Sequence, residues 1–398
     1  MTLSSRRALL KCSFAFAAPR LLSGAEPKKG RRIWAYVGTY TPNGGGIHVF
    51  SMNPSNGVLT PFRVVSAINN PSWLAFDPQK KFLYSANEET GARNKAGSVT
   101  AYKVDEDSGD LTMVNAASSE GAGPAHLSVD PSGKYVLVAN YAGGNVAVLP
   151  INADGSVAAA TDVKDTASAC SPRCETGPLH PAKAPPGSFA ISGHDAPHAH
   201  MFQTDPSGNF AIANDVGIDR TVIWRFDRTA GKLLDPKTVA SSPGAGPRHF
   251  VFHPNGRWFY SLNEESSTMT TMTFDAAKGE LTPVDEISTL PAGFTGTSFT
   301  SEVVITGDGK FVYALNRLHD SIAIFAVGAT GKLRLTGEVW TQSDYPRNCA
   351  IDPTGNFLFV CHNKSDNVTS FRIHRATGKL TFTGQYIPVG SASAIVFL

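Results

Sequence analysis

Short hydrophobic or alternating runs, separated by tight turns, recur along most of the chain. In one unit, residues 250–252 (Phe-Val-Phe) lead into His-Pro-Asn-Gly at 253–256, and a second β-rich run covers residues 258–262. Proline fixes φ at the second position of a tight turn and glycine tolerates positive φ at its end. Each unit therefore predicts two antiparallel strands joined by a tight turn.

The unit occurs six times, and each copy ends on an asparagine. A third run and a fourth run follow, separated by turns such as Lys278-Gly279. The closing asparagines are 47 to 74 residues apart, which is the length of a propeller blade. Four antiparallel strands make one blade. The closing residues are Asn87, Asn140, Asn214, Asn263, Asn316 and Asn363.

Both ends of the chain supply strands for a seventh unit. Residues 33–38 and 46–50 have the pattern of a second and a third strand, and residues 394–398 have that of the missing first strand. Pairing them would remove the open edges of a six-bladed ring. We therefore predict an all-β domain over 33–398, a seven-bladed β-propeller of four-stranded antiparallel blades, closed by pairing the N- and C-terminal strands. A long insertion at 161–196 interrupts the repeat.

The repeat also predicts which residues converge. The start of each first strand and the end of each second strand lie on one rim, opposite the Pro-x-Gly turns. A rim of carboxylates, imidazoles and guanidiniums suits an anionic small molecule. The insertion precedes His198, and its sequence leaves open whether it is a lid or a solvent loop. The rim residues are Glu88, His126, Tyr141, His198, Asp215, Arg248, Glu264, Glu302, Arg317 and Arg347.

The first 25 residues differ from the rest. Adjacent Arg6 and Arg7 precede a short apolar run and a small-residue site, the parts of a twin-arginine-like export signal. We expect residues 1–25 to be removed, 26–32 to be a linker, and the mature protein to be periplasmic or secreted. The alternative is a basic tail on a cytoplasmic protein. No later segment is apolar for long enough to cross a membrane.

Charge and cysteine content narrow the function further. Without the four basic residues of the signal, 35 lysines and arginines fall to 31, against 33 acidic residues. Nothing resembles a nucleic-acid footprint, and we expect a monomer that does not bind membranes. Cys170 and Cys174 share one loop and could form a disulfide. Cys349 and Cys361 fall on adjacent strands and are either paired or simply buried.

Several motifs resemble the propeller-type 6-phosphogluconolactonase family. They are Val-Gly-Thr-Tyr at 37–40, Asn-Tyr-x-Gly-Gly-Asn-Val at 140–146, Gly-Pro-Arg-His at 246–249 and Tyr-Pro-Arg at 345–347. The resemblance covers most of 33–398 and implies a lactonase with a propeller fold. The same superfamily contains muconate-lactonising enzymes, whose proposed site combines a histidine, a glutamate and two arginines.

That resemblance places the site on particular residues. By motif the histidine is His198, the glutamate Glu264 and one arginine Arg248, with Arg317 or Arg347 as the other. Opening a lactone needs a base for the attacking water and a cation near the developing oxyanion. We therefore expect Glu264 or His198 to act as base.

Further residues complete the expected site. Arg317, Arg347, Glu302 and Tyr141 would bind the substrate, the guanidiniums through its carboxylate or phosphate. No cofactor is implied. The pair His198 and His200 suggests a metal site, but no third ligand is evident, so we expect no metal.

Other interpretations of the same residues remain. Arg248 and Arg347 could pair with a neighbouring blade, and Glu302 could be structural. The chain could then be a non-catalytic propeller that binds a ligand or protein at the rim, because fold alone does not give function. A lactonising reaction is also compatible with these groups. Export would favour an unphosphorylated lactone, since phosphorylated sugars are cytoplasmic.

Overall fold

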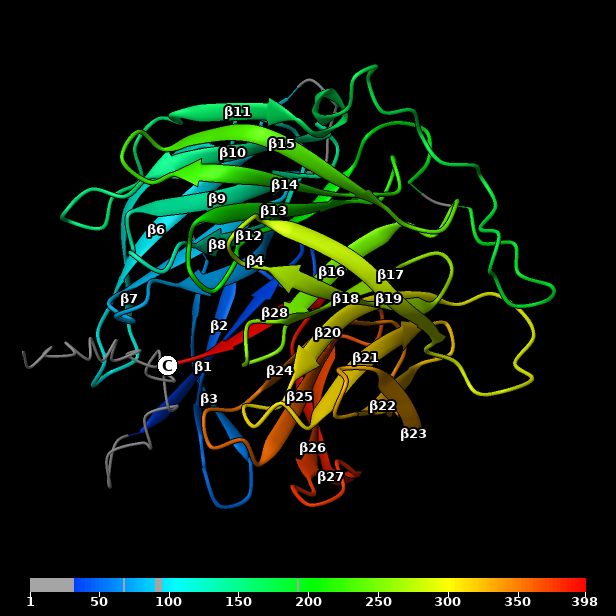
Figure 1. Cartoon of the computed structure of the whole chain (residues 1–398). Helices are drawn as coiled ribbons and strands as arrows, with labels where there is room; N and C mark the ends of the chain where they lie inside the picture. The colour runs from blue at the N-terminus through cyan, green and yellow to red at the C-terminus, as the bar shows by residue number, and fades with distance from the viewer. Residues whose placement is uncertain (1–31, 67–68, 90–94, 192) are drawn as a thin grey trace, which may run out of the picture.

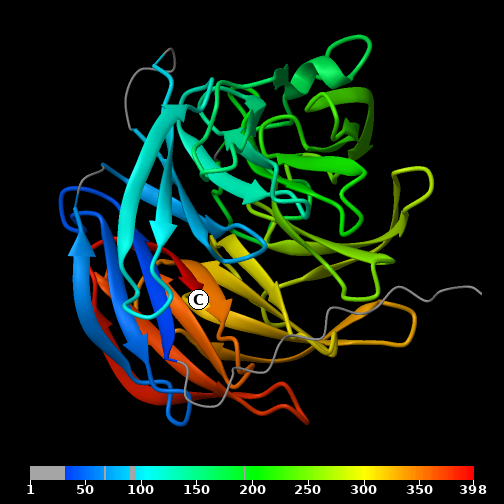
Figure 2. The ribbon, with the colours of Figure 1, turned by 90° about the vertical axis from the view of Figure 1, so that its left-hand side faces the viewer.

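The computed structural model describes residues 32–66, 69–89, 95–191 and 193–398, which form seven four-stranded antiparallel sheets around a central axis (Figures 1 and 2). From the inner to the outer strand, the first three blades are β28 (Ala392–Phe397), β1 (Ile33–Thr39), β2 (Ile47–Met52) and β3 (Leu59–Val65); β4 (Pro71–Phe76), β5 (Phe82–Asn87), β6 (Ser98–Val104) and β7 (Leu111–Ser118); and β8 (Pro124–Val129), β9 (Tyr135–Asn140), β10 (Asn145–Pro150) and β11 (Asp162–Asp165). The next two are β12 (Ala199–Thr204), β13 (Phe210–Asp215), β14 (Arg220–Asp227) and β15 (Lys232–Ala240); and β16 (Pro247–Phe252), β17 (Trp258–Asn263), β18 (Thr268–Asp275) and β19 (Glu280–Ser288). The last two are β20 (Phe299–Ile305), β21 (Phe311–Arg317), β22 (Ser321–Val327) and β23 (Leu333–Trp340); and β24 (Pro346–Ile351), β25 (Phe357–His362), β26 (Asn367–Ile373) and β27 (Leu380–Pro388). The predicted fold is confirmed.

Four of the tight turns between first and second strands owe their shape to an aspartate, at positions 77, 130, 205 and 352. In the β8–β9 turn, the buried Asp130 accepts hydrogen bonds from the backbone N–H groups of Ser132, Lys134 and Tyr135 at 2.8–3.0 Å. Gly133 in this turn has φ of 72°, a conformation that glycine adopts without a steric penalty. These turns gather on the face of the ring opposite the rim residues.

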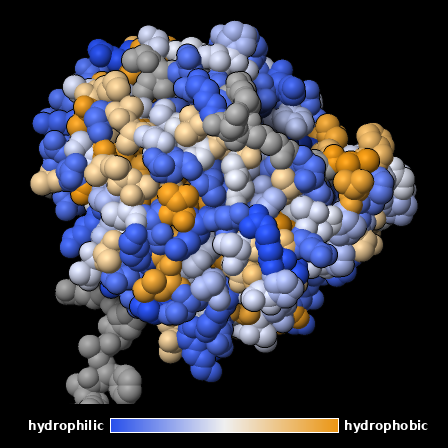
Figure 3. Space-filling model, turned by 90° about the horizontal axis from the view of Figure 1, so that it is seen from above, coloured by the Kyte–Doolittle hydropathy of each residue, from blue (hydrophilic) through white to orange (hydrophobic). Residues whose placement is uncertain are grey.

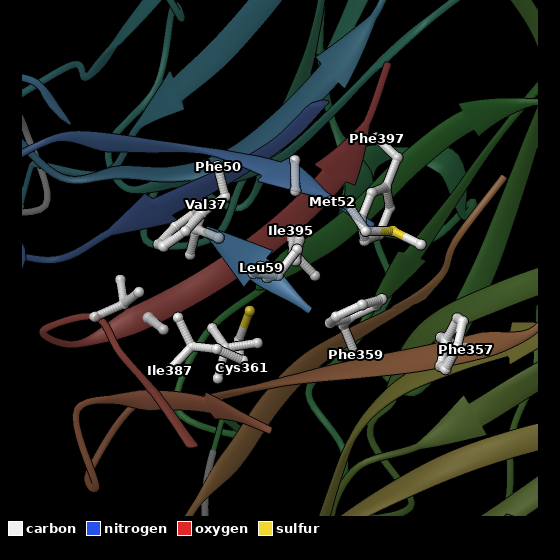
Figure 4. Packing of buried hydrophobic residues seen from close by; sticks show 14 of the residues in the cluster. Val37, Phe50, Met52, Leu59, Phe357, Phe359, Cys361, Ile387, Ile395 and Phe397 are labelled. Carbon is white, nitrogen blue, oxygen red and sulfur yellow. The ribbon is translucent and has the colours of Figure 1, made fainter. Parts of the chain in front are cut away.

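The blade shared by the two chain ends closes the ring. β28 pairs with β1, so that Val37 lies opposite Ile395. Ile395 and Phe397 are buried against the neighbouring blade, where Phe397 and Phe359 have ring centroids 5.2 Å apart (Figure 4). This packing of sheet against sheet is repeated between blades and makes the core continuous around the ring.

The closing asparagines are structural. Five of the six, at positions 87, 140, 214, 263 and 316, have buried side chains, and several of these join neighbouring loops and strands. In the last unit the buried His362 ends β25, and Asn363, which follows it, is partly exposed. Asn214 Nδ2 donates to Ser261 Oγ of the next blade at 3.0 Å, and Asn316 Nδ2 donates to the carbonyl of Thr289 at 3.0 Å. The recurrence of asparagine at this position therefore reflects the need to satisfy buried polar groups between blades.

The insertion lies along the rim. The predicted segment 161–196 contains the short strand β11, and the connection proper runs from the 3₁₀-helix η1 (Thr166–Ala169) to the start of β12. It bonds to rim loops of two blades, because Ala182 N donates to the Pro243 carbonyl and Gly296 N donates to that of Pro186. It is the loop extending to the right in Figure 1, on the opposite side from the chain's C-terminus.

The described cysteines differ in state. Cys170 and Cys174 form a disulfide within the insertion, whereas Cys349 and Cys361 are free and buried. The Cys170–Cys174 segment is anchored through Cys174 N, which donates to the carbonyl of Ala167 at 2.9 Å. The disulfide therefore braces a local turn of the insertion.

Exposed large hydrophobic side chains lie mostly on the outermost strands of the blades and on the insertion. The insertion exposes Leu179, Phe189 and Ile191. Figure 3, seen from above Figure 1, shows a mostly hydrophilic surface with a hydrophobic patch towards its right edge, the side on which the insertion protrudes. In the part of the chain that the structure describes, no helix has the length and apolarity needed to span a bilayer. The expected export signal at 1–25 lies outside the described residues.

Candidate functional site

A β-bulge at the rim end of the inner strands orients the predicted site residues. In β16 the pairing steps from Pro247–Asn263 to His249–Leu262, which leaves Arg248 as the extra residue. The same shift leaves His200 extra in β12 and Arg347 extra in β24. A bulge adds one residue to one strand and re-aims its side chain. In each of these inner strands, the bulge therefore changes the direction in which one side chain points, relative to a regular strand.

Glu264 binds two of the predicted arginines. It follows β17, and its Oε2 lies 3.0 Å from Nε of Arg248 while its Oε1 accepts a hydrogen bond from Nη2 of Arg317. Arg248 is 2% exposed and Arg317 is 5% exposed, so these ion pairs are shielded from bulk water. Arg317 also donates to the carbonyl of Thr300 at 2.7 Å. One carboxylate thus holds two guanidiniums in fixed positions.

The electrostatics of this cluster follow from burial and charge. Burial alone would raise the pKa of Glu264, but Arg317 and then Arg248 overcome it and hold that pKa below its usual range. Burial lowers the pKa of Arg248 to about 10, against the opposing influence of Glu264. At neutral pH the cluster is one carboxylate with two cations, and its net charge is positive.

Arg347 lies on the same rim but has other contacts. Its Nη2 lies 3.5 Å from Oε2 of Glu88, and its guanidinium lies 5.0 Å from the centroid of the Tyr40 ring. Glu88 also accepts a hydrogen bond from the Tyr40 hydroxyl. Arg347 therefore belongs to a second ion pair, formed across the blade that closes the ring.

His198 and Tyr141 form the wall beside the insertion. Their rings are stacked, with centroids 4.3 Å apart. His198 Nδ1 lies 2.8 Å from the backbone carbonyl of Tyr141, and Nε2 lies 2.9 Å from Oδ1 of Asp195. Both ring nitrogens thus face oxygen atoms, one of the main chain and one of a carboxylate.

A second group of titratable residues lies deeper in the ring. His249 Nδ1 is 3.0 Å from Oε1 of Glu302, and His249 Nε2 is 3.1 Å from Nδ1 of His200. Glu302 Oε2 accepts a hydrogen bond of 2.6 Å from Asn348. All four residues are 5% exposed or less. Glu302, predicted to bind substrate, therefore contacts two inner-strand side chains.

The predicted site residues therefore fall into three groups. Arg248, Glu264 and Arg317 are in direct contact, Tyr141 and His198 form an adjoining wall, and Glu302 lies deeper. Arg347 belongs with the first group electrostatically, since it helps to lower the pKa of Glu264. The contributions of His200 and His249 were not foreseen. The sequence cue was available, since His249 directly follows Arg248 and His200 follows His198 by two residues.

The spacing of His198 and His200 suggests a pair of metal ligands, but the expectation from the sequence is that no metal binds. Within the described ranges, no group of three or more His, Cys, Asp or Glu side chains is arranged to hold a metal ion. The two histidines instead have separate partners, Asp195 for His198 and His249 for His200.

The fold and this rim define a closed propeller with a buried, guanidinium-rich cluster on one face of the ring. Residues 34–397 match the family model of the lactonases with a seven-bladed β-propeller. The chain belongs to this lactonase family, as its motifs predicted.

Relatives named as lactonases agree with this assignment. The 6-phosphogluconolactonase of Bacillus subtilis strain 168 is 33% identical, over 91% of this chain and 97% of its own. That of Formosa agariphila is 30% identical, over 90% of this chain and 98% of its own. The structure of the periplasmic gluconolactonase of Pseudomonas aeruginosa superimposes with a TM-score of 0.81 at 30% identity, covering 92% of this chain and 99% of that one.

Proposed function

We propose that this protein hydrolyses the ring ester of a sugar-acid lactone. The observation that supports this most is the pair of guanidiniums fixed by Glu264, because preorganised cations stabilise the oxyanion that forms when water attacks an ester carbonyl. Relatives named 6-phosphogluconolactonase and gluconolactonase support the same chemistry. The reaction needs no cofactor and, in this proposal, no metal ion.

Each charged residue has a role in this proposal. Arg248 and Arg317 stabilise the developing oxyanion or bind an anionic group of the substrate, and Glu264 holds them apart and in place. Arg347 adds positive charge from the blade next to that of Arg317. Tyr141 and His198 form the wall against which a sugar ring packs. Glu264 is too strongly paired with cations to be a good base, because its pKa is held low.

The physiological substrate in this proposal is an unphosphorylated aldonolactone. Two observations support it: the twin-arginine-like segment at the N-terminus and the relative named as a periplasmic gluconolactonase. A periplasmic or secreted enzyme would meet free sugar lactones rather than phosphorylated ones. Replacing Arg6 and Arg7 by lysine and fractionating the cells tests the export step. Unchanged release into the periplasm would contradict it.

A panel of sugar lactones, with and without phosphate, tests the activity in a pH-indicator assay. We expect hydrolysis above the spontaneous rate, reduced at least 100-fold in Arg248→Ala and Glu264→Ala. Arg225→Ala is the matched control, because Arg225 forms an exposed ion pair with Asp235 on an outer strand. Wild-type rates equal to the spontaneous rate for every lactone would favour a non-catalytic binding propeller. Activity lost on adding a chelator would contradict metal independence.

A further inference from the structure

The side chains of Glu302, His249 and His200 form a continuous hydrogen-bonded chain from the interior of the ring to the wall of the site. They come from the inner strands β20, β16 and β12, and their contacts are 3.0 Å and 3.1 Å long. Each histidine in such a chain can be protonated on either nitrogen, and the partner of one nitrogen decides which. The protonation state of Glu302 therefore determines which nitrogen of both rings carries the proton.

The two states of the chain present different atoms to the site. When Glu302 is ionised, His249 donates from Nδ1 to Glu302, and His200 donates from Nδ1 to Nε2 of His249. The lone pair of His200 is then on Nε2. When Glu302 is protonated, it donates to Nδ1 of His249. His249 then donates from Nε2 to Nδ1 of His200, and Nε2 of His200 carries the remaining proton. One group thereby serves as a base in the first state and as an acid in the second.

The second ring nitrogen of His200, Nε2, lies at the end of the chain away from Glu302. Among the described residues, none makes a hydrogen bond to this atom, and the atom is not fully buried. The His200 ring meets the Tyr141 ring edge-on, with centroids 5.4 Å apart, and Tyr141 belongs to the rim. On the other side, Trp73 and His126 line the cavity that opens on the turn face. Those two rings contact His249 and separate it from that cavity.

We propose, on the basis of the proposed lactonase function, that His200 is the catalytic base and that Glu302 and His249 are the positioning residues that receive its proton. A water O–H bond breaks as the water oxygen bonds to the lactone carbonyl carbon, and the proton passes to His200 Nε2. The Nδ1 proton of His200 moves to His249 Nε2, and the Nδ1 proton of His249 moves to Glu302. Collapse of the tetrahedral intermediate breaks the ring C–O bond, and the chain runs backwards to protonate the departing oxygen.

This proton relay through His200, His249 and Glu302 avoids forming an imidazolium, a cation that the buried surroundings disfavour. Burial, and then Arg248, hold the pKa values of His200 and His249 well below their usual range, so neither ring is stable as an imidazolium. Burial raises the pKa of Glu302 to about 7, against the opposing charge of Arg248. A base with a pKa near the working pH is the most effective. The charged or titratable groups around the chain are Arg248, Arg317, Arg347, Glu264, His126, Tyr141, Cys349 and Cys361.

Kinetics of variants test the relay. We expect kcat of the wild type to fall on the acid side with an apparent pKa near 7, as Glu302 becomes protonated. Glu302→Gln and His249→Gln should lower kcat by about 100-fold or more and remove that limb, with KM changed less than about threefold. His200→Gln should have the largest loss in kcat. The control is His253→Asn, whose ring lies on the turn face and contacts Asn255 and Gly309.

A second measurement on the wild type keeps the test independent of whether the variants fold. Nitrogen NMR of histidine-labelled protein distinguishes the two neutral tautomers. We expect His200 and His249 to change tautomer together between pH 5 and pH 9. Tautomers that stay constant over this range, or a Glu302→Gln enzyme with the wild-type kcat and pH profile, would overturn the relay while leaving the lactonase proposal intact. Absence of lactone hydrolysis in the wild type would instead remove the proposed function.

Discussion

His194 Nδ1 of the insertion lies 2.8 Å from Oε2 of Glu265, the residue that follows the arginine-binding Glu264. His194 Nε2 lies 3.1 Å from Oδ1 of Asp219, and Asp219 also accepts hydrogen bonds from the backbone N–H groups of Gly244 and Gly246. Glu264 N in turn donates to the carbonyl of Gly246 at 2.7 Å. A single buried imidazole thus joins the insertion to the loops that position Glu264.

The charge of His194 makes part of the stability depend on pH. Burial would lower its pKa, but the hydrogen bonds and charges of Asp219 and Glu265 raise it to about 10. The folded value lies above that of the unfolded chain, about 6.5. The stabilisation is therefore complete below pH 6.5 and is lost as pH rises through 10. We expect the melting temperature of the wild type to fall over this interval.

His194→Gln should remove that dependence. The variant leaves two buried carboxylates without their cation, so we expect a loss of about 3 kcal/mol in the free energy of unfolding at pH 7. Urea unfolding at pH 6, 8 and 10 measures it, with His48→Gln, on β2, as the control. The difference between wild type and variant should shrink as pH rises. A difference independent of pH would contradict a protonated His194.

Replacing Arg317 by lysine keeps the charge but removes the planar guanidinium. Arg317 donates to Glu264, to the Thr300 carbonyl and, at 3.3 Å, to the Tyr345 hydroxyl, and an ammonium cannot span all three. We expect kcat/KM to fall by about 100-fold, with little change in melting temperature. Arg225→Lys is the conservative control, because its partner Asp235 is exposed. Wild-type kcat/KM in Arg317→Lys would show that charge alone is sufficient.

Removing residues 391–398 should abolish cooperative folding. The truncation deletes β28, which pairs with β1 and supplies Ile395 and Phe397 to the core. Ile395→Ala is a graded test, for which we expect a loss of about 2–5 kcal/mol. Thermal unfolding followed by circular dichroism measures both. A truncated protein with an unchanged melting temperature would refute closure of the ring by β28.

The cysteines should respond differently to reagents. Burial raises the pKa of the Cys349 and Cys361 thiols, so both should be unreactive towards a thiol reagent in the native protein and react after unfolding. The disulfide between Cys170 and Cys174 closes a very short loop, so its reduction should cost no more than about 2 kcal/mol. Rapid labelling of native Cys361 would contradict the packing of β25.

The sequence was sufficient to predict the blades and the rim, but not the partners within the rim. Turns of the Asp-Pro-x-Gly type have a local cause, visible in the contacts of Asp130. The bond between Arg317 and Glu264 joins residues 53 positions apart on different blades. It depends on how two sheets pack, which a repeat pattern does not encode.

The histidines show a second reason why contacts within the rim could not be predicted from the sequence. His198 and His200 were expected to share a strand face, but pairing in β12 shifts between Ala199 and Met201. A one-residue shift reverses the direction of the side chains that follow. His198 consequently stacks on Tyr141, whereas His200 contacts His249. Bulges of this kind have no reliable signature in a single sequence. The chain from Glu302 to His200 was therefore found only in the structure.

The blade shared by the chain ends has a consequence for the order of events during synthesis. β1, β2 and β3 are among the first strands to leave the ribosome, yet the inner edge of β1 has no partner until β28 emerges. Until then the inner edge of β1 stays unpaired, and an open strand edge favours association with other chains. Folding of the whole propeller is thus coupled to the synthesis of β28, the last of the described strands to be made.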